Sequence, residues 1–125
     1  MIDNTKNGEP LDLSYLREMS GDSAEFMIEM LDAFLTQTPI YMTDLEKEVV
    51  VSNWKTASEV AHKIKPTFFY VGRADARDHM QEIERNARER KSLESIPAAF
   101  EEIKSFLPVL YQQLEDAKVE LRKEL

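Results

Sequence analysis

His62 and Lys65 are the two residues of this chain whose types and spacing are best suited to chemistry. They stand three positions apart, so on a helix their side chains are neighbours one turn apart. An imidazole is nucleophilic when neutral, and an ordinary histidine pKa of about 6.5 leaves much of it neutral at physiological pH. A lysine ammonium within reach can neutralise an anion attached to the ring. The pair therefore predicts a site that carries an anionic group such as a phosphoryl group.

Helical periodicity predicts that His62 points away from the apolar face of its helix. At about 100° per residue, His62 lies about 140° from Ala57, outside the apolar stripe. The outward face predicts a docking surface around the histidine, formed by Lys55, Ser58, Glu59, Lys63, Pro66 and Phe69. Phe69 is the most informative of these, because a large apolar side chain on a solvated face is typical of a partner contact. The alternative is the ordinary scattered exposure of one aromatic residue.

The charge distribution sets this region apart from the rest of the chain. The 125 residues carry a formal net charge of −8, which opposes nucleic-acid binding. The segment 54–77 contains two acids, Glu59 and Asp75, and five bases, which are Lys55, Lys63, Lys65, Arg73 and Arg77. Its charge is therefore +3, which leaves −11 for the remainder of the −8 total. We expect a basic surface around His62.

Composition excludes several other classes of site. The chain has no cysteine, which excludes disulfides, thiolate zinc sites and thiol nucleophiles, and favours a reducing compartment such as the cytoplasm. No signal peptide or membrane span is predicted, and no glycine-rich or Walker-type phosphate loop is present. We therefore expect a cytoplasmic phosphoryl carrier without a kinase site or cofactor of its own, which depends on another protein for phosphate.

The apolar patterning predicts an all-α fold, an antiparallel four-helix bundle with a short N-terminal covering helix. A flexible polar arm is expected over residues 1–9 and one helical domain over residues 10–125. The short helix is expected at about 12–20, followed by a long helix through Pro39 to about Val49, in which the proline introduces a kink. The further helices are expected at about 54–71 and 75–90 and from Ile96 onward.

The segment around His62 resembles the signature of histidine phosphotransfer (HPt) domains. Their motif reads Ala-His-x-Leu-Lys-Gly-Ser with a further glycine ten residues after the histidine. Here His62, Ile64, Lys65 and Gly72 match in place, Thr67 stands for the serine, and Pro66 replaces the first glycine. Further segments are similar to the opening, second and following helices of the family, namely Leu11–Arg17, Phe26–Leu35 with Thr38-Pro39, and Ile83–Arg88.

The resemblance implies a role for each matching residue. His62 would be phosphorylated through Nε2, and Lys65 would steady the phosphoryl group. The implied partners are receiver domains of response regulators and of a hybrid histidine kinase, which supply an aspartate and a bound Mg²⁺, while the carrier itself is expected to be a monomer. Pro66 departs from the motif: it lacks an N–H, so the carbonyl of His62 loses its helical hydrogen bond, and a local kink is expected.

Two alternative functions follow from other features of the sequence. Glu59 and His62 have the Glu-x-x-His spacing of di-iron helical bundles, but the only other histidine, His79, has Ala76 three positions before it. His79 is instead expected to be a partly buried structural residue. The second alternative is an HPt-like adaptor that binds receiver domains without accepting phosphate, and Pro66 is the feature that favours it.

Overall fold

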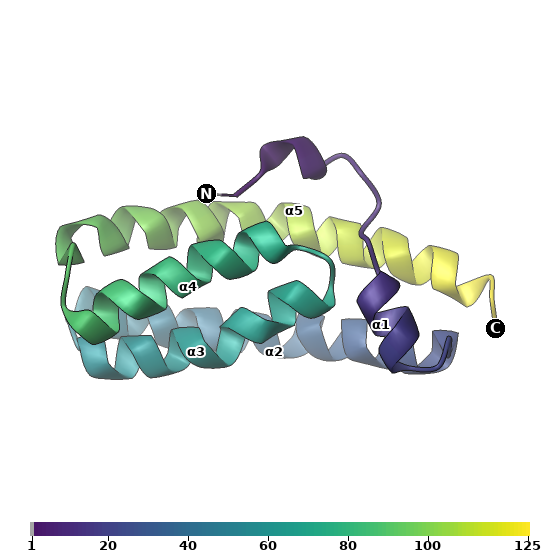
Figure 1. Cartoon of the computed structure of the whole chain (residues 1–125), viewed down its shortest axis with the longest axis horizontal. Helices are drawn as coiled ribbons and strands as arrows, with labels where there is room; N and C mark the ends of the chain where they lie inside the picture. The colour runs from purple at the N-terminus through teal and green to yellow at the C-terminus, as the bar shows by residue number, and fades with distance from the viewer. Residues whose placement is uncertain (1) are drawn as a thin grey trace.

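The computed structural model describes residues 2–125, and every regular element within them is helical (Figure 1). The four long helices are α2 (Ala24–Val50), α3 (Trp54–Tyr70), α4 (Ala74–Glu89) and α5 (Ile96–Arg122). A short helix, α1 (Ser14–Met19), precedes them, and single turns of 3-10 helix, η1 (Asn4–Lys6) and η2 (Leu93–Ser95), precede α1 and α5. The predicted all-α fold with four long helices and one short helix is confirmed. No helix among these residues is long and apolar enough to cross a membrane.

The four long helices pack as a bundle in which each helix contacts two others: α2 contacts α3 and α5, and α4 also contacts α3 and α5. Each helix contributes an apolar stripe to one shared core. Fully buried examples are Leu31 of α2, Ile64 of α3, Met80 of α4 and Ile103 of α5. The short helix α1 adds Leu16, which is also fully buried. This packing holds α3 and α4 side by side, so the two helices can build a site together (Figure 1).

Three prolines lie inside long helices, and two of them, Pro39 and Pro66, bear on the helices that flank the site. Pro39 lies inside α2, which runs as one helix from Ala24 to Val50, so the prediction of a single long helix is confirmed. Pro66 lies inside α3, and the helix continues past it to Tyr70. The apolar stripe continues on both sides of each proline, and tertiary packing of that stripe provides most of the stability of a helix in a protein. His62 before Pro66 and Phe69 after it therefore lie on one continuous helix.

The turn between α3 and α4 is shaped by Gly72. Its φ of +83° lies in the left-handed region, where glycine has no steric penalty. The backbone of Asp12 passes directly over it, so that a Cβ atom at position 72 would lie 2.2 Å from the Asp12 carbonyl oxygen. Gly72 therefore allows the N-terminal segment to lie in contact with the end of the helix that carries His62.

The N-terminal arm has specific partners in the structure, although the sequence predicts it to be flexible. Ile2 is buried with 4% of its surface exposed, and the backbone N–H of Asp3 donates to Asp75 of α4. The side-chain amide of Gln113 in α5 donates to the carbonyls of Lys6 and Glu9. We call residues 2–13 the N-terminal strap, because this segment lies across α4, α5 and the α3–α4 turn (Figure 1). Met1 lies outside the described residues.

The close contact at Gly72 predicts a graded response to alanine substitution. Gly72→Ala should lower the free energy of unfolding by about 2–4 kcal/mol, because it combines a left-handed φ with a steric clash. Gly21→Ala has a φ of +66° but open space around it, and should cost about 1–2 kcal/mol. Gly8→Ala, with open space and no positive φ, is the control and should change little. Chemical denaturation of the three variants measures the series, and equal losses at positions 72 and 8 would contradict the role given to Gly72.

Candidate functional site

His62 lies on the solvated face of α3, as its helical position predicts. Its side chain is 68% exposed, whereas the neighbouring Ala61 and Ile64 are fully buried in the core. The ring is not free in solution, however. Its Nδ1 atom lies 3.0 Å from Oε2 of Glu84, a residue of the adjacent helix α4. One edge of the imidazole is therefore fixed against α4.

Glu84 is a buried carboxylate that joins three basic side chains. Only 6% of its side chain is exposed. Its Oε2 atom accepts from His62 and, at 3.1 Å, from Nη1 of Arg88 one turn further along α4. Its Oε1 atom lies 2.8 Å from Nζ of Lys65. This contact is an ion pair without hydrogen-bond geometry. A buried carboxylate needs such partners, because an unpaired charge in the interior is costly.

The contact with Glu84 determines which ring nitrogen of His62 is available for reaction. An ionised carboxylate has no proton to donate, so Nδ1 must be the donor in this hydrogen bond. In the neutral ring the proton then lies on Nδ1, and Nε2 keeps its lone pair. Because the ring is mostly exposed and its Nδ1 edge faces α4, Nε2 is the nitrogen that a partner can reach.

The surroundings of Glu84 keep it ionised. Burial alone would raise the pKa of this carboxyl group, but the close contacts with the Lys65 ammonium and with His62 outweigh burial. The net result is a pKa below the ordinary glutamate value of about 4.5. Glu84 is therefore an anion at neutral pH, placed to stabilise positive charge that develops on the imidazole.

Lys65 lies beside the histidine as the i+3 spacing predicts, but it is engaged within the protein. Its Nζ atom donates to Oε1 of Gln81 at 2.5 Å in addition to the ion pair with Glu84. The side chain is 18% exposed. An ammonium group has three protons, so these two contacts leave one N–H available for a further anion.

The predicted docking residues divide into two groups. Lys55, Glu59 and Lys63 are exposed, and Pro66 and Phe69 are half-buried, so all five reach the surface of α3. Ser58 does not: only 8% of it is exposed, and its hydroxyl donates to the carbonyl of Lys55. Ser58 is therefore buried and does not share the exposed face that its helical position predicts, and its hydroxyl is satisfied within α3.

Phe69 lies outside the core, but it has more neighbours than its helical position suggests. Its ring contacts the ring of Tyr15 from α1 edge-on, with centroids 5.0 Å apart. Tyr15 also stacks on Tyr70 at 5.6 Å. The guanidinium of Arg77 lies 5.1 Å from the centre of the Phe69 ring, within the range of a cation–π contact. The aromatic surface beside His62 is thus a cluster drawn from α1, α3 and α4, with Tyr15 still 43% exposed.

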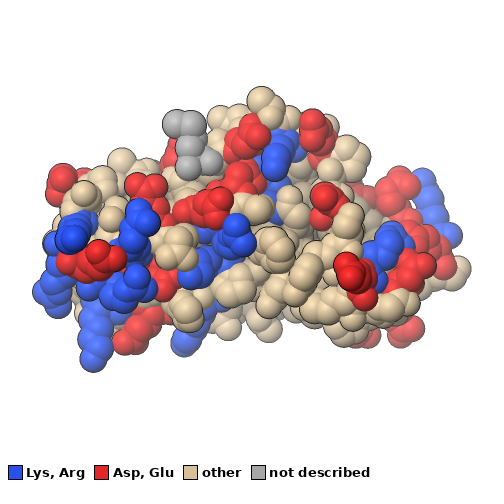
Figure 2. All heavy atoms as spheres, viewed as in Figure 1, with Lys and Arg blue, Asp and Glu red and all other residues tan. Residues whose placement is uncertain are grey.

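The basic surface around His62 has a different composition from the one the sequence predicts. Arg73 is 1% exposed and paired with Asp75, so it adds no charge to the surface. Exposed bases of α4 and its end take its place, and these are Arg85, Arg88, Arg90 and Lys91. Figure 2 shows Lys and Arg gathered at the end of the molecule where α3 begins and α4 ends. Next to them lies an uncharged surface over the C-terminal part of α3.

Sequence reasoning missed Glu84 and Arg88 as members of the site. Both lie in the segment Ile83–Arg88, whose likeness to the HPt family was noted without a role for either residue. At about 100° per residue, Glu84 lies about 80° from Ala76, at the edge of the apolar stripe of α4. A carboxylate at the edge of such a stripe, opposite a helix with a histidine and a lysine, is the signal that could have found it.

The structure offers no support for the di-iron alternative. Glu59 and His62 are both exposed, whereas bundle di-iron ligands project inward. Among residues 2–125, no group of three or more His, Asp and Glu side chains is placed to hold a metal ion. His79 is buried as expected, with Nε2 2.7 Å from the carbonyl of Ala99 and Nδ1 3.1 Å from Glu102.

Comparisons with protein-family models, with curated proteins and with solved structures found no match for this chain. The geometry of the site and the motif around His62 are therefore the features that indicate a function.

The lowered pKa of Glu84 predicts a pH-dependent contribution to stability. A carboxyl group whose pKa falls on folding stabilises the protein above its unfolded value, and the effect is lost as the pH falls through the folded value. The difference in unfolding free energy between the wild type and Glu84→Gln should therefore shrink below about pH 4.5. Glu82→Gln is the control, because Glu82 is exposed on the same helix and makes no ion pair among residues 2–125. Denaturation across pH measures both, and a wild-type advantage that stays constant on acidification would refute the assignment.

Proposed function

We propose that this chain is a histidine phosphotransfer protein, which carries a phosphoryl group on Nε2 of His62 between the aspartates of receiver domains in a two-component phosphorelay. The observation that carries the proposal is the exposed His62 ring whose Nδ1 is held by the buried carboxylate of Glu84. The motif resemblance around His62 supports it independently.

The geometry supports a specific sequence of bond changes. The Nε2 lone pair attacks the phosphorus of an aspartyl phosphate, the P–O bond to the aspartate breaks, and its electron pair returns to the carboxylate. The imidazole gains positive charge as the N–P bond forms, and Glu84 stabilises that charge through Nδ1–H, 3.0 Å away. The reverse reaction passes the phosphoryl group to the next aspartate. Phosphoryl transfer depends mainly on alignment and charge neutralisation; in this proposal the fixed His62 ring contributes to the first and the Lys65 ammonium to the second.

Lys65 has a divided role in this proposal. In the resting protein it neutralises Glu84 and holds Gln81, which fixes the α3–α4 contact beneath the ring. When Nε2 carries a phosphoryl group, the remaining N–H of the ammonium is available to steady it. Lys63 is exposed and is proposed to act at the rim of the partner interface.

The partners in this proposal are receiver domains of response regulators and of a hybrid histidine kinase. Each would supply an aspartate and a bound Mg²⁺, so the carrier needs no metal or nucleotide of its own. The exposed bases beside His62 suit the acidic phosphorylation site of such a domain, and Phe69 offers it an apolar contact. The proposal also includes an antiparallel arrangement of the four long helices, a cytoplasmic location and a monomeric carrier.

One observation favours a second candidate function, an HPt-like adaptor that binds receivers without accepting phosphate. Pro66 follows His62 by one turn and replaces the glycine of the motif, which places a ring where the family has no side chain. Pro66 is half-buried and α3 continues past it, so its ring adds bulk beside the histidine without breaking the helix. The two candidates differ only in whether His62 becomes phosphorylated.

Phosphorylation of His62 tests the proposed function. Incubation with a panel of ³²P-labelled phosphorylated receiver domains and Mg²⁺ should transfer acid-labile label to the wild type and none to His62→Gln. The substitution should change the free energy of unfolding by no more than about 0.5 kcal/mol, because the side chain is mostly exposed. His79→Gln is the matched control and should still accept label. Receiver binding without any label would favour the adaptor, and label retained by His62→Gln would overturn the site.

A further inference from the structure

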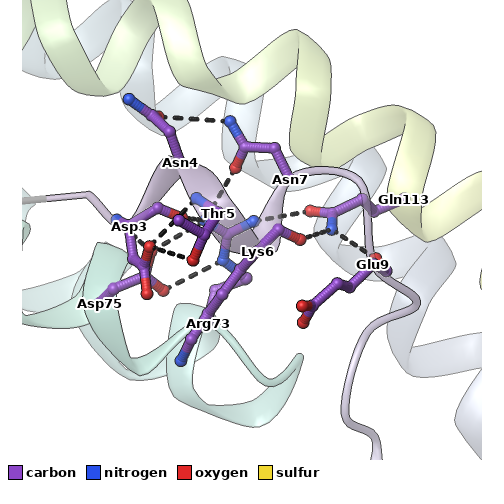
Figure 3. Close-up of polar contacts among 9 residues, drawn as sticks. All are labelled: Asp3, Asn4, Thr5, Lys6, Asn7, Glu9, Arg73, Asp75 and Gln113. Atoms are coloured by element: carbon purple, nitrogen blue, oxygen red, sulfur yellow. Dashed lines mark hydrogen bonds and ion pairs between the residues drawn. The ribbon is translucent and has the colours of Figure 1, made fainter.

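One buried guanidinium, that of Arg73, contacts the N-terminal strap, α4 and α5 together. This residue directly precedes α4 and is only 1% exposed. Its Nη2 atom donates to the carbonyl of Asp3 at 3.2 Å and to the side-chain oxygen of Asn7 at 3.0 Å, both in the strap. Figure 3 shows Arg73 reaching up from the start of α4 into the curve of the strap.

The other contacts of Arg73 join the strap to α4 and α5. The guanidinium donates to both carboxylate oxygens of Asp75, at 3.0 and 2.8 Å, and to Oε1 of Gln113 at 2.8 Å. Gln113 in turn donates to two strap carbonyls, those of Lys6 and Glu9, each at 2.9 Å (Figure 3). Arg73 also lies 4.6 Å from the centre of the Phe106 ring. A guanidinium removed from water to this degree needs all of these partners, and two of them, the Asp3 carbonyl and the Asn7 side chain, come from the strap.

The strap leads directly into the aromatic surface beside His62. After Asp12 passes over Gly72, the chain enters α1, which has only six residues. A helix of this length is not stable on its own in water, so tertiary contacts must fix its position. Leu16 anchors it in the core, Arg17 pairs with Glu124 near the end of α5, and the strap holds its N-terminal end.

The position of α1 determines how Phe69 is presented. Tyr15 packs edge-on against Phe69 and stacks on Tyr70, while Arg77 covers another part of the Phe69 ring. Phe69 lies seven residues after His62, about 10 Å further along the same face of α3. A shift of α1 would therefore change the aromatic surface without moving the imidazole or Glu84.

We propose that Arg73 is a positioning residue, which acts through the strap to hold Tyr15 of α1 against Phe69 and so sets the affinity of this surface for a receiver domain. This inference rests on the proposed function, since the partner is the receiver that exchanges phosphate with His62. The strap contributes to docking and leaves the chemistry at Nε2 unchanged.

The test uses a double variant, Asn7→Ala with Gln113→Leu, which removes three hydrogen bonds that hold the strap but keeps the pair between Arg73 and Asp75. In the free protein, NMR cross-peaks between the rings of Tyr15 and Phe69 should weaken. With the receiver that labels the wild type fastest, KM should rise about two- to tenfold, the range expected for one aromatic contact, while kcat stays unchanged. Phosphorylation of His62 by phosphoramidate, a small donor that needs no docking surface, should proceed at the wild-type rate.

A matched control separates positioning from general destabilisation. Val49→Ala removes two buried methyl groups at the C-terminal end of α2, the end of that helix that lies away from α1. It should leave KM and the Tyr15–Phe69 cross-peaks unchanged. An unchanged KM in the double variant overturns the docking role, and unchanged cross-peaks overturn the positioning role. If neither phosphoramidate nor any receiver labels the wild type, the proposed function fails instead, and the cross-peaks alone then decide the positioning role.

Discussion

The buried carboxylate of Glu84 is the interaction on which the candidate site depends. It lies between α3 and α4 and pairs with His62, Lys65 and Arg88 at 3.0, 2.8 and 3.1 Å. Loss of all three partners would leave a buried charge without compensation, at a cost of about 3–5 kcal/mol, whereas two partners remain when one is removed. The hydrogen bond that satisfies Glu84 also fixes the proton of His62 on Nδ1, which leaves Nε2 free for the proposed phosphoryl transfer. One hydrogen bond thus satisfies the buried carboxylate of Glu84 and also orients the imidazole of His62.

A second buried charge, Arg73, organises the other end of the α3–α4 pair. Glu84 joins the middle of α3 to α4, and Arg73 joins the start of α4 to α5 and to the N-terminal strap. Burial on its own would raise the pKa of Asp75, but the hydrogen bonds from Arg73 and from the Asp3 N–H keep it below the ordinary value. Asp75 is therefore ionised at neutral pH and holds Arg73 in place. Between these two charges lies the segment of α3 that carries His62 and Phe69.

Local patterns in the sequence predict the helices and the outward direction of His62 well. The three/four spacing of apolar residues crosses Pro39 without a break, so the long second helix follows from the pattern alone. The residues that sequence reasoning misplaced are those whose surroundings come from elsewhere in the chain. Arg73 is covered by the strap, about 70 residues away in sequence, and Glu84 pairs with His62 and Lys65, which precede it by 22 and 19 positions. Charged residues are normally expected at the surface, so their burial becomes apparent only from the tertiary contacts.

The position of the phosphoryl group on the imidazole tests the central claim most directly. The protein would be labelled with ¹⁵N at histidine, phosphorylated with phosphoramidate, and examined by ³¹P and ¹⁵N NMR. The account predicts phosphorus–nitrogen coupling at Nε2 of His62, a proton retained on Nδ1, and an Nδ1–H form of the neutral ring before reaction. Phosphorylation at Nδ1, or a neutral His62 with its proton on Nε2, would contradict the role given to Glu84.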